Sequence, residues 1–244
     1  MSFLIVSDIH GNLEALRAVL EDARGLYDRI LCLGDLVGYG ADPNAIVEWV
    51  RENAVATVRG NHDKVSVGID SAENYNPAAQ ASARWTESQL NAGNREFLER
   101  LPRGPLPYEG LDLVHGSPAD EDEYLHQIYQ LPPLRQFLQS RVTLFGHTHI
   151  QGGFLIAPRF VHPIAPHLLL NPLLNLEPDY FYLINPGSVG QPRDHDPRAA
   201  YAIYSKEERT VEFRRVVYDV NRAGAKIRAA GLPDFLAGRL LEGI

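Results

Sequence analysis

Short apolar segments alternate with helical spacing over the first 60 residues. The predicted strands are FLIVS (residues 3–7), RILCLGD (29–35) and AVATVRG (54–60). Between them, apolar side chains recur every three or four positions, at Leu13, Leu16, Val19 and Leu20 and again at Ile46, Val47 and Val50. Strands that alternate with helices favour a parallel sheet joined by right-handed crossovers. This part of the chain therefore predicts an α/β arrangement.

The rest of the chain is richer in predicted strands. Residues 77–101 read as mostly helical, with Pro77 near a helix start and Asn94 as a candidate cap. The strands that follow are LDLVHG (111–116), VTLFGHTH (142–149), YFYLINPG (180–187), AAYAIYS (199–205) and TVEFRRVVY (210–218), and one helix, LPPLRQFLQS (131–140), intervenes. From Asn221 onward the pattern predicts two short helices broken at Gly231-Leu232-Pro233. We expect a second sheet packed on the first, in one domain over residues 1–244.

Residues 158–178 interrupt this pattern. The stretch holds five prolines among leucine-rich segments, so neither a regular strand nor a long helix is expected there. Two interpretations remain open. In one, the stretch is a loop whose leucines fill a small satellite core. In the other, it is a lid or a subunit contact, and a subunit contact would make the protein a homo-oligomer.

Composition sets limits on the function. Apolar residues make up 45% of the chain and charged residues 22%, as in ordinary globular enzymes. No apolar run is as long as a membrane span, the N-terminal run lacks the flanks of a signal peptide, and the single cysteine, Cys32, lies in a predicted buried strand. We therefore expect a cytoplasmic protein without membrane contact. The formal net charge of −8 argues against duplex nucleic acid as a partner, but not against small phosphorylated substrates.

Polar residues follow nearly every predicted strand. The segments are SDIHGN, GDLVGYG and GNHD after the first three strands, and HGS and GHTH after later ones. Because open α/β sheets bind ligands at the carboxyl ends of their strands, we expect these residues to lie together. The set comprises Asp8, His10, Asp35, Asn61, His62, His115, His147 and His149. Each segment alone would also fit a turn, a cap or a solvated histidine, but their joint occurrence is hard to explain structurally.

The chemistry of this set points to divalent metal ions. Asp8 and His10 are two positions apart on an extended segment, so their side chains point the same way. Carboxylates, imidazoles and one amide oxygen, without thiolates, suit borderline or hard cations. Seven ligands of these kinds, from the set of eight residues, suit two ions that share a carboxylate and lie about 3.5–4 Å apart. A pair of this kind holds a bridging hydroxide and serves phosphate ester hydrolysis.

Taken in order, the motifs resemble those of the calcineurin-like metallophosphoesterase superfamily. They are Asp8-x-His10-Gly11, Gly34-Asp35, Gly60-Asn61-His62-Asp63, His115 and Gly146-His147-Thr148-His149. The later NPGSVGQPR (185–193) resembles the bacterial and archaeal phosphodiesterase-like branch. The resemblance implies an α/β fold (α+β by some schemes) in which a two-sheet β-sandwich is flanked by helices.

The same resemblance implies a role for each motif residue. Asp8, His10 and His149 would bind one metal ion, Asn61, His115 and His147 the second, and Asp35 would bridge the two. His62 would contact the phosphate and act as the general acid that protonates the leaving oxygen, while Asp63 would hold its ring. An imidazolium stabilised in this way can donate a proton near neutral pH.

Three further positions are candidates for substrate binding. In the protein serine/threonine phosphatases of the superfamily, an arginine that grips the phosphate stands where this chain has Tyr39, and a glutamate stands in place of Asp63. The missing guanidinium favours a diester over a monoester dianion. Tyr39 would stack on a base or sugar, or face solvent in a turn, and Arg193 would replace the arginine or lie on the surface. Asn12 would cap a helix, contact the phosphate, or do both.

The sequence thus predicts a metal-dependent phosphoesterase that hydrolyses phosphate esters, diesters before monoesters, with a nucleotide-type compound as the expected small substrate. A broad-specificity phosphomonoesterase, or a protein or nucleotide phosphatase, is the alternative within this class. Outside it, the chain would be a non-catalytic scaffold or a nucleotide sensor, although the complete ligand set and His62 argue against a scaffold. Manganese is the expected metal, and iron, zinc and nickel also fit these ligands.

Overall fold

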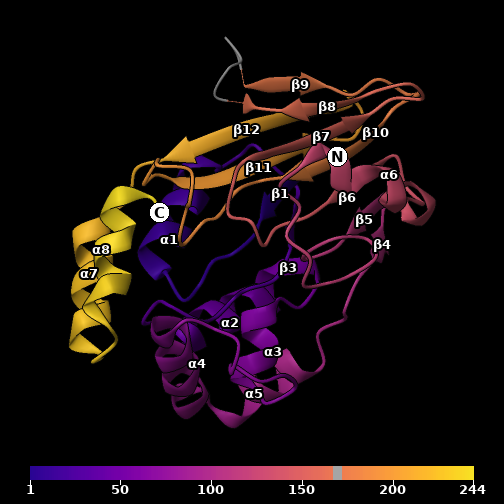
Figure 1. The fold of residues 1–244 in the computed structure, drawn as a ribbon. Helices are drawn as coiled ribbons and strands as arrows, with labels where there is room; N and C mark the ends of the chain where they lie inside the picture. Colours follow the sequence, from indigo (N-terminus) through magenta and orange to yellow (C-terminus); the bar gives the residue numbers. More distant parts are fainter. Residues whose placement is uncertain (167–171) are drawn as a thin grey trace.

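Two mixed β-sheets face each other in the computed structural model, which describes residues 1–166 and 172–244 (Figure 1). The first sheet has the strand order β3 (Ala54–Thr57), β2 (Arg29–Cys32), β1 (Ser2–Val6), β11 (Ala199–Ser205), β12 (Thr210–Val216) and β9 (Leu173–Asn175). The second has the order β4 (Leu106–Tyr108), β5 (Leu111–Leu113), β6 (Val142–Leu144), β10 (Phe181–Asn185), β7 (Gly152–Ile156) and β8 (Val161–Ile164). The expected two-sheet sandwich is confirmed.

Helices pack on the outer faces of this sandwich. They are α1 (Leu13–Asp22), α2 (Pro43–Asn53), α3 (Asn61–Ser66), α4 (Pro77–Gln89), α5 (Ala92–Glu99), α6 (Leu131–Leu134), α7 (Val220–Ala229) and α8 (Asp234–Glu242), with 3₁₀ turns η1 (Ile128–Gln130) and η2 (Arg135–Phe137). Helices α1, α2, α7 and α8 contribute to the core on the outer side of the first sheet. A smaller core on the outer side of the second sheet includes two leucines of α6. The two helices of the C-terminal tail pack against each other beside α1 (Figure 1).

Strand β1 shows how the sequence pattern builds the layers. Phe3 and Ile5 belong to the core between the sheets, whereas Leu4 and Val6 belong to the core under the helices. All four are fully buried, because alternate side chains of a central strand point to opposite faces and both faces are covered. The first three strands pair in parallel, as expected, and β11 adds to β1 in the antiparallel sense.

Two helix predictions are wrong in detail. Asn94 is not a cap, because Asn91 accepts the hydrogen bond at the start of α5 and Asn94 lies inside that helix. Residues 131–140 do not form one helix: only Leu131–Leu134 are α-helical, and 3₁₀ turns flank them. Pro132 and Pro133 lack the N–H groups of a helix interior, which restricts them to a first turn.

The prediction that residues 158–178 contain no regular strand is also wrong. Strands β8 and β9 lie within this stretch, each at the edge of a sheet. An edge strand tolerates Pro163 because one side of it needs no ladder hydrogen bond. Leu174 and Leu176 pack on the core between the sheets and not on a separate satellite core. The leucines at 168–170 lie outside the described residues, so a lid or subunit contact stays a prediction.

Cys32 is fully buried, as expected of a core residue. In the part of the chain that the structure describes, no helix has the length and apolar character needed to cross a lipid bilayer.

Candidate metal centre

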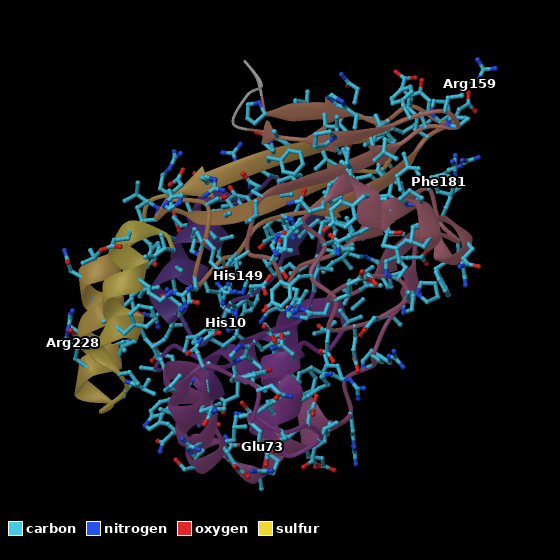
Figure 2. All side chains as sticks on the ribbon, in the orientation of Figure 1. His10, Glu73, His149, Arg159, Phe181 and Arg228 are labelled. Carbon is cyan, nitrogen blue, oxygen red and sulfur yellow. The ribbon has the colours of Figure 1, made fainter. Side chains whose placement is uncertain are left out.

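Residues that follow different strands meet at one place in the structure. They form two groups in which the ligand atoms all lie within 4.8 Å of one another: Asp8, His10, Asp35 and His149, and Asp35, His115 and His147. All of these side chains are buried. Figure 2 labels His10 and His149, which come from distant parts of the chain and lie next to each other near the middle of the molecule. The common location predicted for the strand ends is therefore confirmed.

In the first group, two imidazoles present the same kind of nitrogen to a carboxylate. The Nδ1–H of His10 donates to the carbonyl of Val37 at 2.9 Å, and the Nδ1–H of His149 donates to that of Gln191 at 2.6 Å. A carbonyl can only accept, so these contacts assign the proton to Nδ1 on both rings. The two Nε2 atoms then lie 3.1 Å apart, and that of His149 is 3.2 Å from Oδ1 of Asp8. Lone pairs that converge in this way fit a bound cation.

The second group is built in the same manner. The Nδ1–H of His115 donates to the carbonyl of Leu33 at 2.7 Å, and its Nε2 faces Oδ1 of Asn61 at 3.3 Å. His147 is reversed, because its Nε2–H donates to the carbonyl of Asp122 at 3.1 Å and Nδ1 remains as the available ligand atom. The group thus offers two imidazole nitrogens and an amide oxygen.

Asp35 connects the two groups. Its Oδ2 lies 3.5 Å from Nε2 of His10 in the first group and 3.5 Å from Nε2 of His115 in the second. Its Oδ1 accepts the backbone N–H of His62 at 2.8 Å, which holds the carboxylate in this position. Gly60 permits the approach, because a Cβ atom there would lie 2.1 Å from Oδ1 of Asp35.

The backbone is bent at the candidate ligands. Five of them have left-handed backbone, with φ between 49° and 65°: Asp8, His10, Asp35, His147 and His149. For residues with a side chain this conformation costs on the order of 1 kcal/mol each. It is retained because β1, β2 and β6 are paired on both sides in the sheets and hold the turns that follow them. Such strain is typical of functional sites.

Burial and charge set the protonation of the site. Burial lowers the pKa of His10 and His149, and lowers that of His147 to about 3, so these rings are neutral at pH 7 and keep a lone pair. Burial acts to raise the pKa of Asp8 and Asp35, but the positive charge that His149 carries beside Asp8, and His115 beside Asp35, when these rings are protonated outweighs burial and leaves both pKa values below the usual range. The site therefore carries two ionised carboxylates in a buried position.

His115 is the exception among the histidines. Burial acts to lower its pKa, but Asp35 outweighs burial and raises the pKa to about 10. This ring is therefore protonated at pH 7 and pairs with Asp35. Coordination by its Nε2 would release that proton, as metal binding to a protonated ligand must.

The structure corrects the expectation for Asp63. Its Oδ1 accepts the backbone N–H of Leu36 at 2.9 Å and that of Val37 at 3.3 Å, and its Oδ2 accepts the N–H of Gly60 at 2.9 Å. It does not hold the ring of His62, whose Nδ1 has no hydrogen-bond partner among the described residues. Asp63 instead ties the turn that carries Asp35 to the start of α3.

His62 is also not an imidazolium held by a carboxylate. Its ring is 4% exposed and packs against Tyr39, His10 and Tyr75 with centroid distances of 4.4, 5.0 and 5.1 Å. Burial lowers its pKa to about 4, so the ring is neutral at pH 7 in the free chain. The negative charge of a phosphate would oppose this shift.

The three candidate substrate residues have different surroundings. Asn12 caps α1 through Oδ1, and its Nδ2 donates to the carbonyl of Gly190 and to the hydroxyl of Tyr218, so its amide has no hydrogen left for a phosphate. Tyr39 is buried and not a solvent-facing turn residue. Arg193 is half-buried, and its Nη2 donates to the hydroxyl of Tyr39 at 3.3 Å.

A cavity of about 440 Å³ opens beside the metal-binding residues. His62, Asn61, His147, Tyr39 and Arg193 all contribute to its wall. Sequence reasoning missed further wall residues, among them Tyr75, Asp122, Tyr124 and Arg239. Asp122 and Tyr124 follow the HGS segment closely, which was an available signal, whereas nothing in the pattern of the C-terminal tail distinguished Arg239.

The comparisons with known proteins agree with this geometry. Residues 1–209 match the family described as the calcineurin-like phosphoesterase superfamily domain. The chain belongs to this superfamily. An uncharacterized protein of Methanocaldococcus jannaschii is 38% identical over 247 residues, which cover 98% of this chain and 97% of that protein.

Solved structures show the same superfamily fold. The crystal structure of a metallophosphoesterase from Sphaerobacter thermophilus is similar with a TM-score of 0.87 and 39% identity, covering 100% of this chain and 99% of that one. A hypothetical protein from Pyrococcus horikoshii has a TM-score of 0.80 at 20% identity, covering 100% and 98%, and shows the fold alone. The family therefore supports a phosphoesterase hydrolase, and the buried aspartates and histidines indicate divalent metal binding.

The corrected position of Asp63 leads to a prediction. In Asp63→Asn, one acceptor oxygen becomes an NH₂ group that faces backbone N–H donors, so we expect a loss of about 1–3 kcal/mol in the free energy of unfolding. Urea denaturation of the metal-free protein measures it. Asp179→Asn, at an exposed position, is the control and should change stability by less than about 0.5 kcal/mol. Unchanged stability of Asp63→Asn, with a loss of activity alone, would restore the ring-holding role.

Proposed function

We propose that the protein hydrolyses phosphate esters with the help of two divalent cations, one at each group of ligands. The observation that carries this proposal is the position of Asp35, whose Oδ2 lies at the same distance from a ligand nitrogen of each group. Asp8, His10 and His149 would hold the first cation, and Asn61, His115 and His147 the second. We propose manganese as the cation, with iron, zinc or nickel as alternatives.

The chain's own residues would complete the site. When bound, the cations would supply an activated water as the nucleophile and neutralise charge on the phosphate. His62 lies in the wall of the cavity and its ring packs beside that of the candidate ligand His10, so it is placed to donate a proton to the leaving oxygen. Because its ring is neutral in the free chain, that role requires the incoming phosphate to raise its pKa.

A phosphodiester, of nucleotide type, is the proposed substrate. A diester carries one negative charge and needs fewer cationic contacts than a monoester dianion. Tyr39 stands here where the protein serine/threonine phosphatases of the superfamily carry a phosphate-binding arginine. One observation favours a phosphomonoester as the second candidate. Arg193 reaches the hydroxyl of Tyr39, so a guanidinium lies near the place that the missing arginine would fill.

Hydrolysis of two synthetic esters tests the proposed function. We expect metal-stripped protein to be inactive and to recover turnover with manganese, faster on bis-p-nitrophenyl phosphate than on p-nitrophenyl phosphate. A monoester preference would keep the metal centre and favour the second candidate. Inactivity on both esters with manganese, iron, zinc and nickel would refute the proposed hydrolysis and favour a scaffold or a sensor.

The bridging position of Asp35 predicts the behaviour of Asp35→Asn. An amide has no second anionic oxygen to share, so we expect both cations to bind more weakly by about 10–100-fold, with turnover reduced to a similar or larger extent. Elemental analysis of equilibrated protein counts the cations. Asp120→Asn, on the loop after His115 but outside both groups, serves as the control. Retention of two tightly bound cations and full turnover would refute the bridging role.

The proposed acid predicts a dependence on the leaving group. We expect His62→Ala to keep its cations and to lose about 10²–10⁴-fold in turnover of a diester with an alkoxide leaving group. The loss should be smaller for a p-nitrophenyl ester, because p-nitrophenolate is weakly basic and leaves without a proton. Equal losses on both esters would assign His62 to phosphate binding, and loss of the cations would make it structural.

A further inference from the structure

Two arginines in the wall of the cavity have no Asp or Glu side chain as a partner among the described residues. Arg193 follows the Asn185–Pro192 loop, and Arg239 lies on α8 in the C-terminal tail. Neither forms an ion pair with an acidic side chain within residues 1–166 and 172–244, although the chain as a whole is acidic. By contrast, the acidic wall residues Asp70 and Asp122 both contact Lys64, at 3.7 and 2.6 Å. The positive charge of the two arginines is therefore not paired with these acidic side chains.

Arg193 is held in place but not neutralised. Its Nη2 donates to the hydroxyl of Tyr39 and to Oε1 of Gln191, each at 3.3 Å, and its guanidinium lies 5.8 Å from the ring centroid of Tyr39. Its Nε is buried and has no hydrogen-bond partner among the described residues. A buried guanidinium N–H without an acceptor is costly, and an anion bound by the same guanidinium would offset that cost.

Arg239 is brought to the same cavity by the C-terminal helices. Lys226 of α7 anchors this pair of helices, because its Nζ lies 2.8 Å from both Glu14 and Asp42. The Nε–H of Arg239 donates to the main-chain oxygen of Ile244 at 2.6 Å, so the other nitrogens of its guanidinium stay available. Both arginines line the same cavity, and burial, and then the charge of Arg193, lower the pKa of Arg239. An anion between them would relieve their repulsion.

The arginine pair is offset from the metal-binding groups. The ring of Tyr39 packs against His10 and His62, at centroid distances of 4.7 and 4.4 Å, while its hydroxyl end contacts Arg193. The Tyr39 side chain thus separates the guanidinium from the ligand atoms. The family match ends at residue 209, so the helix that carries Arg239 lies beyond the matched region.

We propose that Arg193 and Arg239 form a second anion subsite, which binds a phosphate group other than the one being hydrolysed. The substrate class is then a compound with at least two phosphate groups, such as a nucleoside polyphosphate or its ester. The proposed subsite rests on the proposed function in one respect, namely that the phosphate to be hydrolysed lies at the metal centre. Two guanidinium groups, one with a free N–H, can chelate a phosphate as planar multidentate donors.

Binding of two nucleotides that differ by one phosphate tests the subsite. The probes are AMP and α,β-methylene-ADP, which resists hydrolysis of its bridge, titrated calorimetrically into manganese-loaded protein. We expect the wild type to bind the diphosphate at least about tenfold more tightly than AMP. In Arg239→Gln this ratio should fall about tenfold, and Arg239→Lys should retain part of it, since the charge remains but the planar fork is lost.

Controls separate this role from others. Arg17→Gln removes one exposed positive charge outside the cavity and should leave the ratio unchanged. Manganese content and melting temperature of Arg239→Gln should match the wild type. Chelation of manganese by the diphosphate in solution is common to all variants and cancels in the comparison.

Three outcomes would overturn the subsite. In the first, the wild type binds both nucleotides equally well or binds neither. In the second, Arg239→Gln weakens the binding of AMP as much as that of the diphosphate, which would mean that the arginines bind the phosphate common to both nucleotides. In the third, the ratio is unchanged in Arg239→Gln. Turnover of bis-p-nitrophenyl phosphate is measured separately, so inactivity together with an intact diphosphate preference would reject the proposed hydrolysis and keep the subsite.

Discussion

The structure depends on the burial of two carboxylates, Asp8 and Asp35, among imidazole nitrogens. Ionised carboxylates are costly to bury, and here the positive charge that neighbouring histidine rings carry when protonated keeps the carboxyl pKa values low in spite of burial. The rings themselves are oriented by main-chain carbonyls, which accept one N–H from each and leave the other nitrogen facing the carboxylates. A cation at each group would satisfy both the negative charge and the converging lone pairs.

This arrangement needs a rigid frame, because the turns that present the ligands are strained. Left-handed backbone at five non-glycine ligands is retained only where the flanking structure leaves no alternative. The frame is supplied by central strands that are buried on both faces, such as β1. Asp63 adds a second restraint, since its carboxylate joins the turn after β2 to the start of α3 through three backbone N–H groups.

The cavity beside the metal-binding groups draws its wall from distant parts of the chain. Tyr39 comes from the turn after β2, Asn61 from the start of α3, Tyr124 from the loop after β5, and Arg239 from the last helix. The ligand groups are thus built from strand ends, whereas the outer wall is built from loops and the C-terminal helices. The same metal chemistry can serve different substrates when only such a wall changes.

The sequence by itself determined the fold class and the set of candidate ligands. Short apolar segments marked the central strands, and the candidate ligands follow those strands, so chain order alone predicted that Asp8, Asp35, His115 and His147 would meet. Local signals failed where local and tertiary preferences differ. Prolines marked residues 158–178 as irregular, yet two edge strands form there, because an edge requires hydrogen bonds on one side only.

Only the tertiary structure decided what each polar side chain contacts. Asp63 adjoins His62 in the sequence but bonds to backbone amides, since hydrogen-bond partners depend on side-chain direction and not on chain distance. Arg193 and Arg239 are 46 positions apart (239 − 193) and belong to no common motif, yet they line one cavity. Packing of α7 against α1, and of α8 against α7, brings them together. A contact of this kind arises from the shape of the assembled core, which no single segment encodes.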